Sequence, residues 1–158
     1  AGFSPTAVME RVSAGFTDVN ALLATAVIVD IPNDEKLPIQ WVNAGHPAGY
    51  WINNNHLITS LNPTGPMLGG FGGDWKSQEI YFGAGDRLVL ASDGLIETQD
   101  DKGEEFGTRG LIASVVSGNS AETSLDLTNL IVSTARQDSV TWNRDDVSVV
   151  VITRRLEK

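Results

Sequence analysis

Apolar and polar residues recur along this chain with helical and with alternating periods, which predicts both helices and short strands. A helix is expected over residues 4–19, because Ser4 suits the N-cap position and Pro5 the first helical turn. Two more helices are expected over residues 108–116 and 121–138, the second capped by Ser120. Apolar or alternating runs predict strands over residues 21–31, 38–43, 50–52, 56–58, 75–82, 88–91 and 147–153.

Neighbouring strands are expected to pair as hairpins. A Pro-Asn-Asp turn separates the strand at 21–31 from the strand at 38–43. Three asparagines at 53–55 separate the strands at 50–52 and 56–58, and asparagine tolerates the positive φ of a tight turn. The sequence therefore predicts antiparallel sheet in the first half of the chain.

Two acidic positions stand at the ends of predicted strands. The apolar run 88–91 stops just before Asp93, so a rigid element would hold this carboxylate. The following Gly94 lacks a Cβ, which allows a sharp turn or the close approach of a ligand. The pair Asp145 and Asp146 precedes the last strand. If these two strands are antiparallel neighbours, their acidic ends converge.

Converging carboxylates allow two interpretations. Hard oxygen ligands in a chain without cysteine favour Mg²⁺ or Mn²⁺ over zinc. Alternatively, Asp-Gly and Asp-Asp are turn residues that flank strands, which is a common use of these residues. Two roles are also open for His46, since a histidine beside a proline either bonds the backbone of its loop or acts directly as a ligand or as an acid/base group.

Composition narrows the class of protein. The 158 residues are 41% hydrophobic, which suits one globular domain spanning residues 1–158. The absence of cysteine excludes disulfides and thiolate chemistry, and agrees with a cytoplasmic setting. A net charge of -9 with only 11 basic residues argues against nucleic acid as a partner. The chain contains no apolar run of about 18 residues, so we expect no membrane partner.

Five motifs in order resemble one protein family. They are Asn-Ala-Gly-His-Pro at 43–47, Gly-Pro-Met-Leu-Gly at 65–69, the Ser-Asp-Gly stretch at 85–97, Glu-Phe-Gly at 105–107 and Asp-Asp-Val-Ser-Val-Val at 145–150. Their order and spacing are similar to those of the stage II sporulation protein E-like branch of the bacterial metal-dependent serine/threonine phosphatases. These are protein phosphatase 2C-like enzymes, the PPM family. The resemblance covers residues 4–153.

The resemblance implies a fold, a chemistry and a set of site residues. The fold would be α+β, an α/β/β/α sandwich of two antiparallel sheets flanked by helices. Water activated by Mn²⁺ or Mg²⁺ would attack the phosphoryl group, with no nucleophilic side chain. By position in the motifs, Asp93 and Asp145 would be metal ligands. Gly94 and Asp146 would support them, and Asn43 and His46 would shape the site.

The family domain usually begins with strands that carry a Gly-Asp motif and an Asp-x-x-Gly-His-Gly motif, whose aspartates complete the metal pair, and these strands are not found before the helix expected at residues 4–19. The chain would then correspond to the C-terminal two-thirds of the family domain, with sheet edges open to pairing, for example in a homodimer. The implied function is a partner-switching phosphatase in sigma-factor regulation, acting on a phosphorylated anti-sigma-factor antagonist. The alternative is a non-catalytic phosphatase-like module that binds a regulatory protein.

Overall fold

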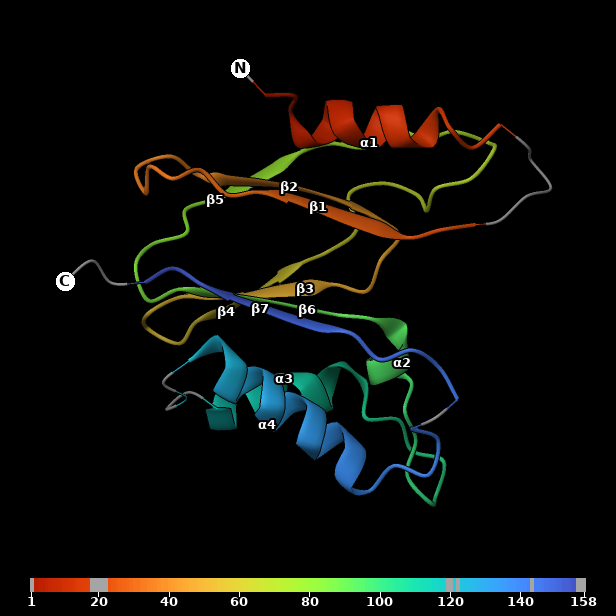
Figure 1. Ribbon diagram of the computed structural model, residues 1–158, viewed down its shortest axis with the longest axis vertical. Helices are drawn as coiled ribbons and strands as arrows, with labels where there is room; N and C mark the ends of the chain where they lie inside the picture. Colours follow the sequence, from red (N-terminus) through yellow and green to blue (C-terminus); the bar gives the residue numbers. More distant parts are fainter. Residues whose placement is uncertain (1, 18–22, 119–120, 122, 143, 156–158) are drawn as a thin grey trace. The chain divides into compact units, whose positions relative to one another are not determined.

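The computed structural model describes residues 2–17, 23–118, 121, 123–142 and 144–155. Its elements, in chain order, are α1 (Pro5–Ser13), β1 (Ala26–Asp30), β2 (Ile39–Ala44), β3 (Gly49–Ile52), β4 (Ile58–Leu61), β5 (Gln78–Ile80), β6 (Arg87–Ala91), α2 (Asp93–Ile96), α3 (Gly107–Ser117), α4 (Ser124–Gln137) and β7 (Val149–Thr153) (Figure 1). They form two compact units. The first unit comprises residues 1–48 and 61–83, and the second comprises residues 49–60 and 84–158.

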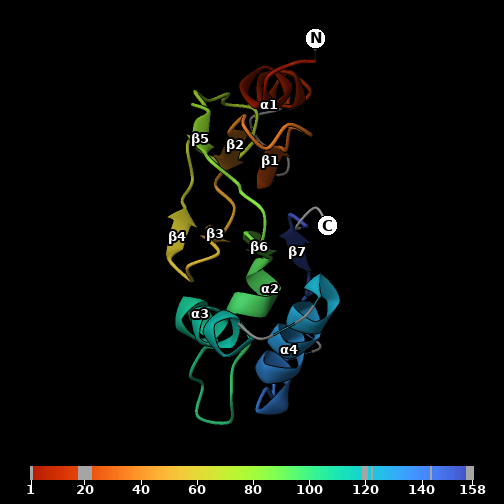
Figure 2. The same cartoon turned by 90° about the vertical axis from the view of Figure 1, so that its left-hand side faces the viewer.

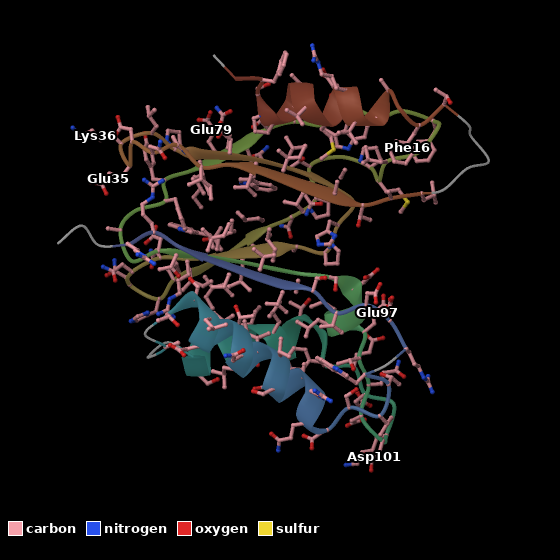
Figure 3. All side chains as sticks on the ribbon, viewed as in Figure 1. Phe16, Glu35, Lys36, Glu79, Glu97 and Asp101 are labelled. Carbon is pink, nitrogen blue, oxygen red and sulfur yellow. The ribbon has the colours of Figure 1, made fainter. Side chains whose placement is uncertain are left out.

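The first unit is an antiparallel sheet covered by one helix. The strand order is β1-β2-β5, and Ile28 pairs with Val42 at the centre of the β1–β2 ladder. Helix α1 packs along this sheet, as Figure 1 shows. The core between them consists of five buried residues, joined by Phe16, which is labelled in Figure 3. Its buried members are Met9, Val42, Ala44, Leu68 and Trp75. The expected pairing of the first two strands is confirmed.

Helix α1 begins where the sequence predicts and ends earlier. Ser4 caps it by accepting a hydrogen bond of 3.3 Å from the Ala7 amide, and Pro5 opens the first turn. The helix stops at Ser13, because the amides of Gly15 and Phe16 turn back to carbonyls three residues earlier. Residues 18–22, which include the expected helix end and the expected start of the next strand, lie outside the described residues.

The second unit is a four-stranded sheet with helices on one side. The strand order is β4-β3-β6-β7, and Leu88 and Val89 of the central strand β6 are fully buried. Helix α4 packs on β7 and on α3 (Figures 1 and 2). Its buried residues are Leu127, Ile131 and Ala135, which share one face of the helix. The prediction of an α+β fold with two antiparallel sheets and flanking helices is confirmed.

The predicted start of α4 at residue 121 is wrong. The helix begins at Ser124, with Thr123 as N-cap and Asp126 completing a capping box. The Asp126 amide donates to Thr123 Oγ1 at 3.1 Å, and the Thr123 amide donates to Asp126 Oδ2 at 3.0 Å. This reciprocal pair satisfies two backbone donors at once, so it fixes where the helix starts. Ser120, the expected cap, lies outside the described residues.

The turn between β3 and β4 uses its asparagines differently from the prediction. Asn53 Oδ1 accepts hydrogen bonds of 2.9 Å from the amides of Asn55 and Leu57. Because the side chain closes the turn, the asparagines keep negative φ, and the positive φ of 66° falls on His56. Within the described residues, the longest helix is too short and too polar to cross a membrane.

Candidate functional site

The two acidic segments of the sequence meet at one end of the second unit's sheet. Strands β6 and β7 are antiparallel neighbours, with Ala91 opposite Val149. Asp93 follows the last residue of β6 by two positions, and Asp145 and Asp146 precede β7. The expected arrangement of the two strands is therefore confirmed.

Ser92 ties the two segments together beyond the regular ladder. Its amide donates to the Ser148 carbonyl at 3.0 Å, and its Oγ accepts from the Ser148 amide at 2.9 Å. The same hydroxyl donates to the Asp146 carbonyl at 3.1 Å. Although Ser92 is the N-cap of α2, its side chain makes no capping bond, because it is engaged across the strands. Sequence reasoning missed this residue.

Gly94 is needed for the approach of the two backbones. A Cβ on Gly94 would lie 2.4 Å from the carbonyl oxygen of Asp146 and 3.4 Å from the Cβ of Asp145. Gly94 is also buried within α2, a single helical turn that the strand pattern did not predict. Glycine therefore lets the chain turn from β6 into α2 beside the Asp145–Asp146 segment, and the approach of a ligand to Gly94, which lines a pocket, stays a prediction.

Each aspartate uses one carboxylate oxygen to fix its own conformation. Asp93 Oδ1 accepts from the Gly94 amide at 3.0 Å, and Asp145 Oδ1 accepts from the Asp146 amide at 2.8 Å. Both side chains are exposed, and within the described residues neither pairs with a lysine or arginine. A separation of about 6 Å or less between the two carboxylates, as two ligands of one cation require, stays a prediction.

A small polar pocket of about 260 Å³ adjoins this corner. Asp145 lines it together with Glu97, which ends α2 one turn after Asp93 and is labelled in Figure 3. Arg144 lies on the same rim. Thr98 and Thr141 also line the pocket and join the loop after α2 to the segment before β7. Acidic and basic groups thus share one polar surface.

The donor atoms of Asp93 and Asp145 are of the type that binds one hydrated divalent cation, and their joint binding of a cation stays a prediction. Asp93 and Asp145 each have a second oxygen, Oδ2, without a partner among the described residues, and carboxylate oxygens are the ligands that Mg²⁺ and Mn²⁺ prefer. In the described part of the chain, no group of three or more His, Asp or Glu side chains is placed to hold an ion. A pair of cations would need further acidic ligands.

Asn43 and His46 belong to the first unit and form a closed turn. The Asn43 side chain accepts from the His46 amide at 2.8 Å and donates to the His46 carbonyl at 3.0 Å. Thr25 is hydrogen-bonded to His46 Nδ1 at 3.0 Å. Gly45, with a φ of 66°, lies where a side chain would strike Met67. The interactions of His46 are those of a loop histidine, and its expected role in shaping a site stays a prediction.

Comparison with known proteins decides the family. The family described as Stage II sporulation protein E (SpoIIE) matches residues 1–155, which is nearly the whole chain. The chain belongs to the SpoIIE family. The predicted resemblance is thereby confirmed, while a search of curated proteins gave no match.

Solved structures share the fold of this SpoIIE-family chain at low sequence identity. The SiaA-PP2C domain of Pseudomonas aeruginosa has a TM-score of 0.77 at 16% identity, over 95% of this chain and 61% of that one. The RsbU and RsbW domains of Rv1364c from Mycobacterium tuberculosis reach 0.77 at 23% identity, over 98% and 43%. The phosphatase domain of SpoIIE from Bacillus subtilis gives 0.62 at 14% identity, over 100% and 77%. The SpoIIE-family chain thus spans less than two-thirds of the first two structures.

Proposed function

We propose that this chain is part of a Mn²⁺- or Mg²⁺-dependent protein serine/threonine phosphatase of the bacterial partner-switching type. Its substrate would be a regulatory protein phosphorylated on serine or threonine, of the anti-sigma-factor antagonist class. Membership of the SpoIIE family and the PP2C-like fold support this proposal. The observation that carries it is the bonding of Ser92 to Asp146 and Ser148, which holds two acidic segments at one corner of a sheet.

Within this proposal each residue has a distinct task. In Asp93 and Asp145, Oδ1 accepts a hydrogen bond from a backbone amide, so the cation would bind to Oδ2 of each. Ser92 positions the two segments, and Gly94 lets them approach. When bound, a divalent cation neutralises charge on the phosphoryl group and makes water more acidic. The exposure of both carboxylates leaves room for a phosphorylated side chain of a protein substrate.

The test is hydrolysis of a phosphoserine protein by the complete protein, with and without Asp93→Asn. We expect the substitution to abolish Mn²⁺-dependent turnover, because it removes a ligand charge and keeps the shape of the side chain. Asp101→Asn is the matched control, since Asp101 is an exposed acid of the same unit, labelled in Figure 3, and should leave turnover unchanged. Full activity of the Asp93 variant would refute the assignment.

A non-catalytic phosphatase-like module is the second candidate. It is favoured by one observation, namely that the described residues contain no group of three acidic or histidine side chains fit for a metal ion. Such a module would bind a regulatory protein with equal affinity in Mn²⁺ and in EDTA, and would not release phosphate from it. Binding and phosphate release measured in parallel therefore separate the two candidates.

A further inference from the structure

A second, larger pocket of about 730 Å³ lies at the opposite end of β6 from Asp93. Arg87, the first residue of β6, lines it, whereas Asp93 follows the end of the same strand. At about 3.3 Å per residue, the four residue steps of β6 from Arg87 to Ala91 correspond to roughly 13 Å. The pocket is therefore separate from the acidic corner, although both lie in the second unit.

The charges on this pocket are opposite to those of the protein as a whole. Its described lining contains Arg87, Arg154, Arg155 and His56 and no Asp or Glu, in a chain of net charge -9. Arg87 is half-buried, and its guanidinium donates to two neutral carbonyls, those of Gly118 at 3.2 Å and Ala121 at 2.6 Å. No described carboxylate pairs with Arg87. A fixed, partly desolvated positive charge in a concave site attracts anions.

The first turn of α4 adds backbone donors to the same wall. Thr123, Ser124 and Leu125 line the pocket at the N-terminus of this 14-residue helix. The capping box satisfies the amides of Thr123 and Asp126, whereas those of Ser124 and Leu125 have no acceptor among the described residues. Free amides at a helix N-terminus bind phosphate well. Arginines and helix amides thus supply two independent reasons for an anion to bind here.

Hydrogen bonds within the protein hold the walls of the pocket together. Asp86 is 5% exposed, and its carboxylate accepts from Trp51 Nε1 at 3.0 Å and from the Asn54 amide at 2.9 Å, which holds the turn that lines one side. Ser124 and Thr153 share a hydrogen bond of 2.8 Å between helix and strand. The Gly85 amide donates to the Arg154 carbonyl at 2.8 Å. A pocket of this size with a fixed shape suits a small molecule.

We propose that this pocket binds a small molecule carrying phosphate groups. Two adjacent phosphates match the two charges of Arg87 and Arg155 better than a single phosphate does, since each guanidinium favours its own oxyanion. The pocket contains none of the carboxylates assigned to the cation, so the proposal stands apart from the phosphatase function.

Amide NMR of the ¹⁵N-labelled protein, titrated with pyrophosphate in EDTA and 150 mM NaCl, tests the proposal. We expect saturable shifts at Gly85, Ser124 and Leu125 and none at Gly94. Pyrophosphate should bind at least about tenfold more tightly than inorganic phosphate. Because EDTA removes the cation, the result does not depend on the phosphatase proposal.

Charge reversal at one exposed arginine gives the matched comparison. Arg155→Glu should weaken pyrophosphate binding by about tenfold or more, because it replaces an attractive charge in the pocket with a repulsive one. Arg109→Glu makes the same change of net charge at an exposed position of α3 outside the pocket, and should change affinity by less than about twofold. Equal weakening by both variants, shifts centred on Gly94 or absence of saturable shifts would overturn the proposal.

Discussion

The hydroxyl of Ser92 donates to the carbonyl of Asp146 across 3.1 Å, although 54 residues of chain separate them. The same oxygen accepts a hydrogen bond from the Ser148 amide. One side chain therefore satisfies two backbone groups of the segment that leads into β7, the Asp146 carbonyl and the Ser148 amide. The carboxylates of Asp93 and Asp145 are exposed and bond only the amide of the next residue. Ser92, by contrast, makes three hydrogen bonds to the segment before β7. The geometry of the acidic corner therefore depends on a residue that carries no charge.

Replacing Ser92 by Ala should lower the free energy of unfolding by about 1–3 kcal/mol, because two backbone groups lose a partner. Urea denaturation of the purified variant measures this loss. Ser133→Ala is the control, since Ser133 is exposed on α4 and bonds only within its helix, so a change of about 0.5 kcal/mol or less is expected. Equal effects of the two substitutions would show that the cross-strand bonds contribute little.

Gly94→Ala should be more damaging than the loss of a hydrogen bond. The new methyl group would meet the Asp146 carbonyl oxygen at 2.4 Å, so the backbones must separate, at a cost of about 1–3 kcal/mol or more. Thermal unfolding followed by circular dichroism reports the change. Gly2→Ala, where no atom lies within 4 Å of the added Cβ, should unfold like the parent. A Gly94 variant as stable as the Gly2 variant would contradict the close approach.

Residues 1–158 should bind Mn²⁺ weakly, with a dissociation constant of about 1 mM or above, because two exposed carboxylates form the weak end of oxygen-ligand sites. Paramagnetic broadening of the amide signals of Gly94 and Asp146 locates the ion, and calorimetry gives the affinity. Asp145→Asn should remove the broadening, whereas Asp138→Asn should not. Micromolar binding of two ions by this chain would mean that other residues build the site.

Thr123→Ala should lower the free energy of unfolding by about 1 kcal/mol, because the capping box of α4 is lost. Thr123→Ser keeps the hydroxyl and should recover most of this loss. Chemical denaturation of the three proteins under one set of conditions checks the order of stability. If the serine variant were as unstable as the alanine variant, packing of the threonine methyl group would explain the effect instead of capping.

Sequence patterns predicted the elements that local chemistry determines. Ser4 and Pro5 start α1 as expected, and the apolar run ending at Ala91 is a buried strand. The sequence also contains the signal for the start of α4, because Thr123 followed three residues later by Asp126 is a capping-box pattern. Ser120 was a competing candidate for the N-cap. The positive φ of His56 could not be predicted from the sequence, because it follows from the hydrogen bonds that the Asn53 side chain makes in the folded turn.

The acidic corner was predictable only in part. The strand ends at Asp93 and Asp145 pointed to convergence, and the ladder of β6 and β7 places these segments together. The role of Ser92 could not be read from the sequence, because its partners lie more than 50 residues away and are backbone atoms. The basic pocket was equally hidden, since Arg87, Arg154 and Thr123 come from separate segments and no local pattern joins them.

The pairing of β3 with β6 and of β6 with β7 also determines when the second unit can form during synthesis. Tyr50 pairs with Val89, and Leu88 pairs with Ile152. Strand β3 therefore leaves the ribosome well before its partner β6, and β6 in turn waits until the later strand β7 has been made. Such long-range pairing slows folding and leaves strand edges exposed to other nascent chains. The turn between β3 and β4, which is made before this wait, carries exposed polar side chains at Asn54, Asn55 and His56.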